Sequence, residues 1–186
     1  MMQSVTRFVE QHLKLRVNRA KSEVARPWHR KFLGYSFSWH FKTRIRVAKQ
    51  TIERFKGNLK VLFRRGRGRN LVRFIQKDLN LVLRGWSNYF RLTEFRGFAE
   101  DLDKWLRRRL RCILWRQWKR PWKHFQMLMK HGLSEKRAVQ SAFNQRGAWY
   151  NAGASHMNQA FPKRYFDRFG LICTLDSLRR FGTVLT

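Results

Sequence analysis

The residues best suited to bind a ligand in this sequence are bases and tryptophans, and they are densest between Lys104 and Lys123. This stretch holds nine Lys or Arg residues and four Trp, and no acid lies between Asp103 and Glu135. Guanidinium groups bind phosphates through paired hydrogen bonds, and indole rings stack on nucleic-acid bases. A merely solvated helix face would interleave acids with the bases. The stretch therefore predicts contact with a nucleic acid, and RNA is favoured.

The same stretch predicts one helix with two unlike faces. Helical spacing places Leu102, Leu106, Leu110, Ile113 and Leu114 on one arc. The opposite arc holds Lys104, Arg107, Arg108, Arg111, Trp115 and Trp118. We expect its four bases to bind RNA, together with Lys119 and Lys123. The two tryptophans either stack on RNA or lie buried beneath the C-terminal region, and burial is favoured because large aromatic side chains are usually covered.

A second basic group lies earlier in the chain and consists of Arg64, Arg65, Arg67 and Arg69, with glycines at 66 and 68. Glycines let a loop bring its backbone amides and guanidinium groups close to a phosphate backbone. A flexible linker would not need four arginines. These four residues are therefore added to the expected RNA-binding set.

Other site chemistries are not supported by the sequence. Cys112 and Cys173 form no paired motif, so two reduced thiols are expected rather than a zinc site or a disulfide. The six histidines are scattered. The acids at 100, 101 and 103 begin a helix, where its dipole and neighbouring bases explain them better than a metal site. We assign no catalytic residue, no metal and no cofactor.

Composition agrees with a polyanionic partner. The chain of 186 residues has 42 Lys plus Arg and 11 Asp plus Glu, a net charge of +31, with 43% hydrophobic residues. Such a chain repels itself unless a polyanion compensates, while its apolar content suffices for a packed core. An anionic membrane is the competing partner, but no apolar run approaches the roughly 18 residues needed to span a bilayer. We expect a cytoplasmic protein.

The elements that must position these bases are helices. Apolar residues recur at helical spacing in three segments between Arg46 and Arg120. The central stripe comprises Leu71, Ile75, Leu79, Val82, Trp86 and Tyr89. Short Gly-containing links favour antiparallel neighbours, so we predict an up-down-up three-helix bundle. Gly85 is expected to mark either a kink or a close-packing point.

The segment before the bundle predicts one helix and short strands. A helix is expected over Gln3–Leu13, with brief strands at Leu15–Val17 and Glu23–Arg26. The run Lys31–Trp39 predicts a further strand in which Gly34 marks a close approach to the backbone. Two or three such strands are not stable alone. They therefore suggest the edge of a larger sheet.

The segment after Pro121 predicts short helices separated by turns. One helix begins after Ser134 and the last begins at Thr174, with a turn-rich stretch between. Asn151, Ser155, His156 and Asn158 could read nucleic-acid bases, but turn formation and capping are the favoured roles. A Ser-His hydrolase is disfavoured because no nucleophile elbow or acid partner is evident.

These segments together resemble group II intron reverse transcriptases. Leu13–Ser22 followed by Lys31–Phe37 resembles the end of the palm, and Leu83–Phe90 with its flanking helices resembles the maturase-specific thumb or X domain. The resemblance implies palm remnant at 1–42, thumb at 43–121 and a DNA-binding-like region at 122–186. The implied fold is mainly α, with a thumb bundle, a small β-hairpin remnant and short C-terminal helices.

The resemblance also implies the partners. The family's Tyr-Ala-Asp-Asp motif, which holds Mg²⁺, is missing here, so this chain looks like a C-terminal part that is no enzyme on its own. The thumb is expected to bind intron RNA for splicing and mobility, in the bacterial cytoplasm. A DNA target or template duplex is the second expected partner, with Asn151, His156, Asn158, Lys163 and Arg164 as candidates. Alternatives are half of a split reverse transcriptase, completed by a separate fingers and palm chain, or a non-specific basic protein.

Overall fold

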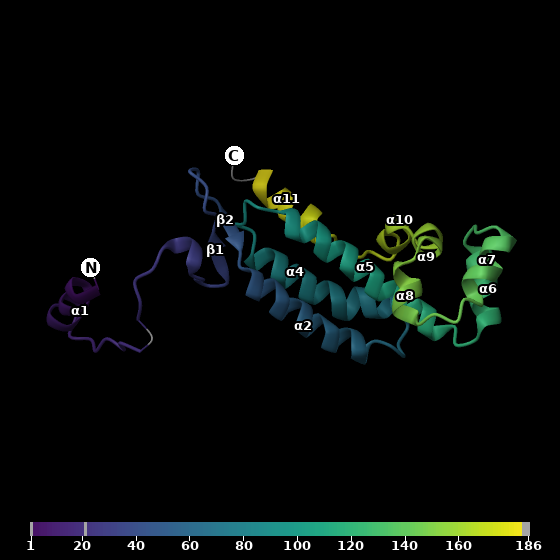
Figure 1. The fold of residues 1–186 in the computed structure, drawn as a ribbon, viewed down its shortest axis with the longest axis horizontal. Coiled ribbons are helices and arrows are strands. Elements are labelled where there is room, and N and C mark those ends of the chain that lie inside the picture. The colour runs from purple at the N-terminus through teal and green to yellow at the C-terminus, as the bar shows by residue number, and fades with distance from the viewer. Residues whose placement is uncertain (1, 21, 184–186) are drawn as a thin grey trace.

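Three long helical segments lie side by side and form the centre of the molecule (Figure 1). The computed structural model describes residues 2–20 and 22–183. Helix α2 covers Lys49–Arg65 and α5 covers Gly97–Gln117. Between them runs one continuous helix made of α3 (Leu71–Arg73), the π-helical segment η2 (Phe74–Leu79) and α4 (Asn80–Tyr89). The predicted up-down-up bundle and the mainly α fold class are confirmed.

The core of the bundle is a layer of leucines with aromatic side chains at its ends. Leu59 of α2, Leu83 of α4 and Leu106 of α5 are fully buried. All five residues of the predicted apolar arc of α5 are buried as well. Each fully buried leucine contributes about 1.5–3 kcal/mol relative to an exposed one, so these contacts dominate the stability of the domain.

The π-helical segment shifts the apolar stripe of the central helix by one residue. The N–H of Asn80 bonds to the carbonyl of Ile75, five residues back, so this turn contains one residue more than an α-helical turn. Beyond it, Leu83 and Phe90 are buried, whereas Val82 is 37% and Tyr89 56% exposed. The expected stripe through Val82 and Tyr89 is therefore wrong, because regular α-helical spacing does not hold through η2.

Two other expectations for the central helix have different outcomes. Gly85 is exposed within α4, and a Cβ added there would meet no atom within 4 Å, so the expected packing point is not found. Trp86 is half-buried and stacks on Phe55 of α2, with ring centroids 4.5 Å apart. Its indole therefore closes one end of the core, as its place in the stripe predicted.

The N-terminal segment contains a short helix and a two-stranded hairpin. Helix α1 covers Met2–Gln11, and the 3₁₀ turn η1 covers Pro27–His29. Strands β1 (Tyr35–Phe37) and β2 (Ile45–Val47) are antiparallel, and the other two expected strands, at 15–17 and 23–26, are not formed. The strand predicted at 31–39 thus has a partner within this chain, because β2 follows it after a short connection.

The hairpin is attached to the bundle by polar and aromatic contacts. The Tyr35 hydroxyl donates to the Tyr89 carbonyl (2.6 Å), and the Tyr89 hydroxyl donates to the Leu33 carbonyl (3.1 Å). Gly34 has φ +83°, and a Cβ there would lie 3.0 Å from the Phe90 ring. The close approach expected at Gly34 is confirmed. The hairpin also spans residue 42, where the palm remnant was expected to end.

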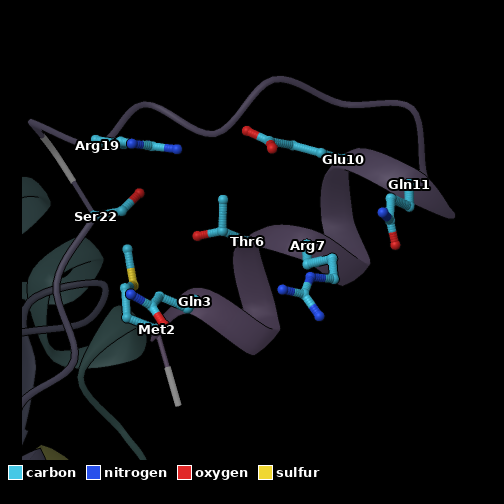
Figure 2. Close-up of a pocket in the computed structure, with 8 residues that line it drawn as sticks. All are labelled: Met2, Gln3, Thr6, Arg7, Glu10, Gln11, Arg19 and Ser22. Atoms are coloured by element: carbon cyan, nitrogen blue, oxygen red, sulfur yellow. The ribbon is translucent and has the colours of Figure 1, made fainter.

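Helix α1 lies apart from the bundle and is joined to it by an extended segment (Figure 1). A surface recess of about 570 Å³ lies between α1 and this segment, with polar side chains from both (Figure 2). None of the α1 side chains is buried, so this helix adds little to the core.

Short helices follow α5: α11 lies beside α4 and the first half of α5, and the others gather towards the C-terminal half of α5 and beyond its end (Figure 1). They are α6 (Pro121–Lys130), α7 (Glu135–Ala142), α8 (Ala148–Gly153), α9 (Ser155–Ala160), α10 (Lys163–Asp167) and α11 (Thr174–Thr183). The helices predicted after Ser134 and from Thr174 are confirmed. Pro121 occupies the first turn of α6, where a missing N–H costs nothing.

Asp103 joins α5 to the start of α11. Its buried carboxylate accepts hydrogen bonds from the backbone N–H groups of Thr174 (3.0 Å) and Leu175 (3.1 Å) and from the Thr174 hydroxyl (2.7 Å). Carboxylate bonds to the free N–H groups of a helix start are strong because the charge also faces the positive end of the helix. Asp103 was expected to interact with the dipole of its own helix, α5, but it caps the start of α11 instead.

A pair of substitutions tests the shifted stripe. We expect Leu83→Ala to lower the free energy of unfolding by about 2–5 kcal/mol, because apolar burial is reduced and a cavity remains. Val82→Ala, one residue away on the exposed side, should change it by no more than about 0.5 kcal/mol. Urea denaturation followed by circular dichroism measures both. Equal effects of the two substitutions would contradict the register described here.

Candidate nucleic-acid interface

The strongest candidate site is a basic recess where the α2–α3 loop meets the end of α5. We call it the loop recess. Its volume is about 620 Å³. It is lined by Arg67, Gly68, Arg69, Asn70, Arg116, Gln117 and Lys119. Two segments that are far apart in sequence therefore supply one site.

Specific contacts hold the loop against α5. The Gln117 side-chain amide donates to the carbonyls of Arg67 (3.2 Å) and Arg69 (2.9 Å). A Cβ at Gly66 would lie 2.5 Å from the Phe74 ring, so the loop can leave α2 this closely only with glycine there. The Asn70 side chain accepts from the Arg73 N–H (3.1 Å) and caps the following helix. The loop backbone is thus fixed before any ligand binds.

The charge of the loop recess is strongly positive. Four of its lining side chains are Lys or Arg and none is an acid; Arg69 forms an ion pair with Asp78 at its edge (3.4 Å). Burial lowers the pKa of the adjacent Arg109, and the charges of Arg116 and Arg67 act in the same direction. The lowered pKa means that the positive charges of these arginines repel one another. A bound anion would reduce this repulsion. Asn70 and Gln117 add neutral polar groups, so the site suits phosphate oxygens.

The structure gathers about half of the expected RNA-binding residues at this site. Arg67, Arg69 and Lys119 line the loop recess, and Arg64 and Arg65 are exposed or partly exposed in the last turn of α2 just before it. Lys123 is exposed in α6. Arg116 was missed, although its seven-residue spacing from Arg109 places both on one helix face.

Lys104 and Arg107 do not join this group. Lys104 forms an ion pair with Glu100 (2.7 Å), and both side chains are exposed. Lys104 lies about 18 Å along the α5 axis from Arg116, given the α-helical rise. Arg107 is half-buried one turn further on. The expected single basic face of α5 is therefore divided along the helix.

The C-terminal helices cover the part of α5 that was expected to be open. Arg111 is buried, and its Nε donates to the Phe161 carbonyl (2.9 Å). Arg108 donates to the Trp149 carbonyl (3.0 Å) and lies over the Trp149 ring at 4.1 Å. The expectation of a solvent-facing surface is wrong at both positions, because a helical projection shows where a side chain points but not what packs against it.

The two tryptophans of this face are covered, as favoured. Trp115 is buried and stacks on His124, with ring centroids 3.9 Å apart. Trp118 is half-buried, and its ring centroid lies 5.5 Å from that of Phe161. Neither indole is free in this structure to stack on a base.

The candidate base-reading residues of the C-terminal region mostly serve the fold. The buried Asn151 side chain donates to the Arg146 carbonyl (2.8 Å) and accepts from Asn144 (2.7 Å). Asn158 donates to the Gly153 and Ala154 carbonyls, both at 3.0 Å. These bonds correspond to the favoured role in turns. Base reading by Asn151 is wrong for this structure, because the side chain is enclosed.

The remaining candidates differ in exposure. His156 is buried against Trp115 and cannot reach a base without unpacking. Ser155 accepts from the Arg137 guanidinium (2.9 Å) and makes no capping bond. Lys163 is exposed but forms ion pairs with Asp176 (3.5 Å) and Asp167 (3.9 Å). Arg164 is exposed.

The described residues offer no cluster of three or more His, Cys, Asp or Glu side chains that could hold a metal. Within the same ranges, no helix is long and apolar enough to cross a bilayer.

Replacing Arg111 separates a structural role from an RNA contact. We expect Arg111→Gln to destabilise the fold by about 1–3 kcal/mol, since the enclosed Phe161 carbonyl loses its donor. Arg64→Gln, at an exposed position of α2, should change stability by less than about 0.5 kcal/mol. Thermal denaturation of both variants measures the difference, and an unchanged Arg111→Gln would show that this side chain is not held as described.

Acid should weaken the packing around His156. Burial lowers its pKa below the ordinary 6.5, and the charge of Arg137 lowers it further. The unfolded chain then takes up the proton first, so stability is full above about pH 6.5 and is lost as the pH falls towards the folded pKa. His156→Leu should reduce the decrease in melting temperature between about pH 7.5 and 5, unlike exposed His40→Gln. If the melting temperatures of the unmodified protein, His156→Leu and His40→Gln fall equally with pH, His156 is not the group responsible.

Comparison with known families identifies the central segment. Residues 52–132 match the family described as group II intron, maturase-specific domain. The match extends from the first turn of α2 to the turn after α6 and includes every residue of the loop recess. No curated protein matches the chain. The resemblance seen in the sequence is thus confirmed for this segment, which is similar to the group II intron maturase-specific domain.

Proposed function

We propose that this chain binds group II intron RNA through the loop recess and thereby assists splicing. The observation that carries the proposal is a recess with four basic side chains and no acid, lying wholly within the maturase-specific segment. Phosphate contacts made by Arg and Lys supply most of the affinity of such interfaces and carry no sequence information. Arg64 and Arg65 add exposed bases in the last turn of α2, and Lys123 adds one in α6.

The chain acts, in this proposal, by binding rather than by catalysis. Splicing chemistry in group II introns belongs to the RNA, so a protein that prefers the active RNA fold raises its population. The acids near the start of α5 support this view, because Glu100 pairs with Lys104 and Asp103 caps α11. Neither carboxylate is free to hold a catalytic metal.

Further partners follow from the family resemblance. A DNA target would contact the C-terminal region, where Lys163 and Arg164 are the exposed candidates that remain. A separate fingers and palm chain would add polymerase activity that this chain is proposed to lack. We place these activities in the bacterial cytoplasm.

Substitutions in the loop recess test the proposal. We expect Arg67→Gln and Arg116→Gln each to weaken binding of intron RNA and to reduce the slope of log K against log salt by about 0.7–0.9 for each phosphate that is no longer neutralised. Melting temperatures should stay unchanged, because both side chains are exposed. Filter binding across a salt series gives affinity and slope.

Lys104→Gln is the matched control, since it removes one positive charge far from the recess. Its affinity should exceed that of either recess variant at every salt concentration. If all three variants are weakened to the same extent, binding follows net charge and the loop recess is not the interface.

A further inference from the structure

The hairpin meets the starts of α2 and α5 at the other end of the bundle (Figure 1). The residues there line a second cationic recess. We call it the hairpin recess. Its volume is about 640 Å³. It is lined by His29, Arg30, Lys31, Ser36, Arg46, Val47, Ala48, Lys49, Gln50, Ile52, Phe95 and Phe98. None of the residues expected from the sequence to bind RNA lies in it.

The basic side chains of the hairpin recess come from three separate segments. Lys31 precedes β1, Arg46 lies on β2, and Lys49 begins α2; all three are exposed. No acid lines the recess, and within the described ranges none of these three bases has an acidic partner. A fourth base of the recess, Arg30, does pair with an acid, Glu23, and Glu94 accepts from the Ile45 N–H.

The start of α2 adds a further positive contribution. This 17-residue helix has Ala48 at its N-cap, and no side chain caps its first N–H groups. The unpaired N–H groups and the helix dipole attract an anion to this end. The helix start matters here only because three cations and a cavity surround it.

The lining of the hairpin recess also includes two aromatic side chains, Phe95 and Phe98. Phe95 is 59% exposed, and Phe98 packs edge-on against Trp86 with ring centroids 5.7 Å apart. Phe98 is thus held by the core, while Phe95 offers a ring to solvent. A nucleic-acid base can stack on such a ring whatever its identity, because every base has a π face.

We propose that the hairpin recess binds one nucleotide of a single-stranded polynucleotide, with a phosphate among Lys31, Arg46 and Lys49 and a base against Phe95. A single strand fits better than a duplex, since only an unpaired base can leave its own stack to lie on a side chain. The inference rests on the proposed function and adds a second contact point to it.

The two recesses set a minimum length for a strand that engages both. They lie at opposite ends of α2, whose 17 residues span about 25 Å at the α-helical rise. A stacked strand advances about 3.4 Å per nucleotide, so roughly seven nucleotides bridge that distance. Shorter strands can occupy only one recess at a time.

Photocrosslinking with the full chain tests the site directly. The probe is an oligouridine of about 12 nucleotides, long enough for both recesses, with one 5-iodouridine. Irradiation should attach it to the peptide that contains Phe95, and Phe95→Leu should abolish that crosslink while crosslinks near the loop recess persist. Crosslinks confined to the loop recess would overturn the inference and leave the proposed function standing.

Affinity measurements by fluorescence anisotropy complete the test. Phe95→Leu should weaken binding of the single strand about tenfold, whereas Phe95→Tyr should retain it, since a stacking ring remains. Arg46→Gln with Lys49→Gln should lower the salt slope by about 0.7 for each phosphate that is no longer neutralised. A 4-nucleotide probe is too short to reach both recesses. Its affinity should therefore respond to only one of the two substitutions: to Arg116→Gln if it binds in the loop recess, or to Phe95→Leu if it binds in the hairpin recess.

The outcomes separate the two ideas. If Arg116→Gln weakens binding and Phe95→Leu does not, the hairpin recess is not a nucleotide site. If neither substitution matters, the proposed function fails as well. Equal sensitivity of a fully paired RNA duplex to Phe95→Leu would refute base stacking. Unchanged melting temperatures should accompany every variant, because the replaced side chains are exposed.

Discussion

The leucine layer shared by α2, α4 and α5 is the contact on which the rest of the molecule depends. The bases of a chain with a net charge of +31 repel one another, and burial of apolar surface is the main contribution that opposes this repulsion. Its fully buried members include Leu59, Leu83 and Leu106. Of the described Lys and Arg side chains, only Arg111 is buried, and the others are at least partly exposed to solvent.

The basic side chains fall into two groups that differ in their surroundings. Arg108, Arg109 and Arg111 are partly desolvated and rest on aromatic rings or carbonyl groups of the C-terminal helices. Burial lowers the pKa of Arg111 to about 10, which measures how poorly this position solvates a charge. The bases of the two recesses, in contrast, have almost no acidic partners. These are the bases that we propose to contact a polyanion.

The sequence predicted contacts within one helix well and contacts between segments poorly. The bundle and the arc from Leu102 to Leu114 follow from periodicity alone, because each helix must bury its apolar side. Arg111 was expected to bind RNA but is buried, whereas Arg116 was not singled out but lines the loop recess. The sequence could not show this, because the residues that pack over α5 lie about 40–50 positions later in the chain. Asn80 was not singled out, although its side chain bonds to Gly170 and Ile172. Such long-range polar pairs leave no local pattern.

The π-helical segment gives the central helix two competing apolar stripes, one residue apart. A regular α-helix would turn Val82 and Tyr89 towards the core; the extra residue turns Leu83 and Phe90 there instead. With Leu83 and Phe90 buried, the Tyr89 ring lies at the surface, and its hydroxyl donates a hydrogen bond to the Leu33 carbonyl. The contact between the hairpin and α4 thus depends on the extra residue in the π-helical turn between Phe74 and Leu79, because this residue sets the rotation of α4 about its axis. The π-helical turn and the hairpin are thus linked through the rotation of α4, which lies between them.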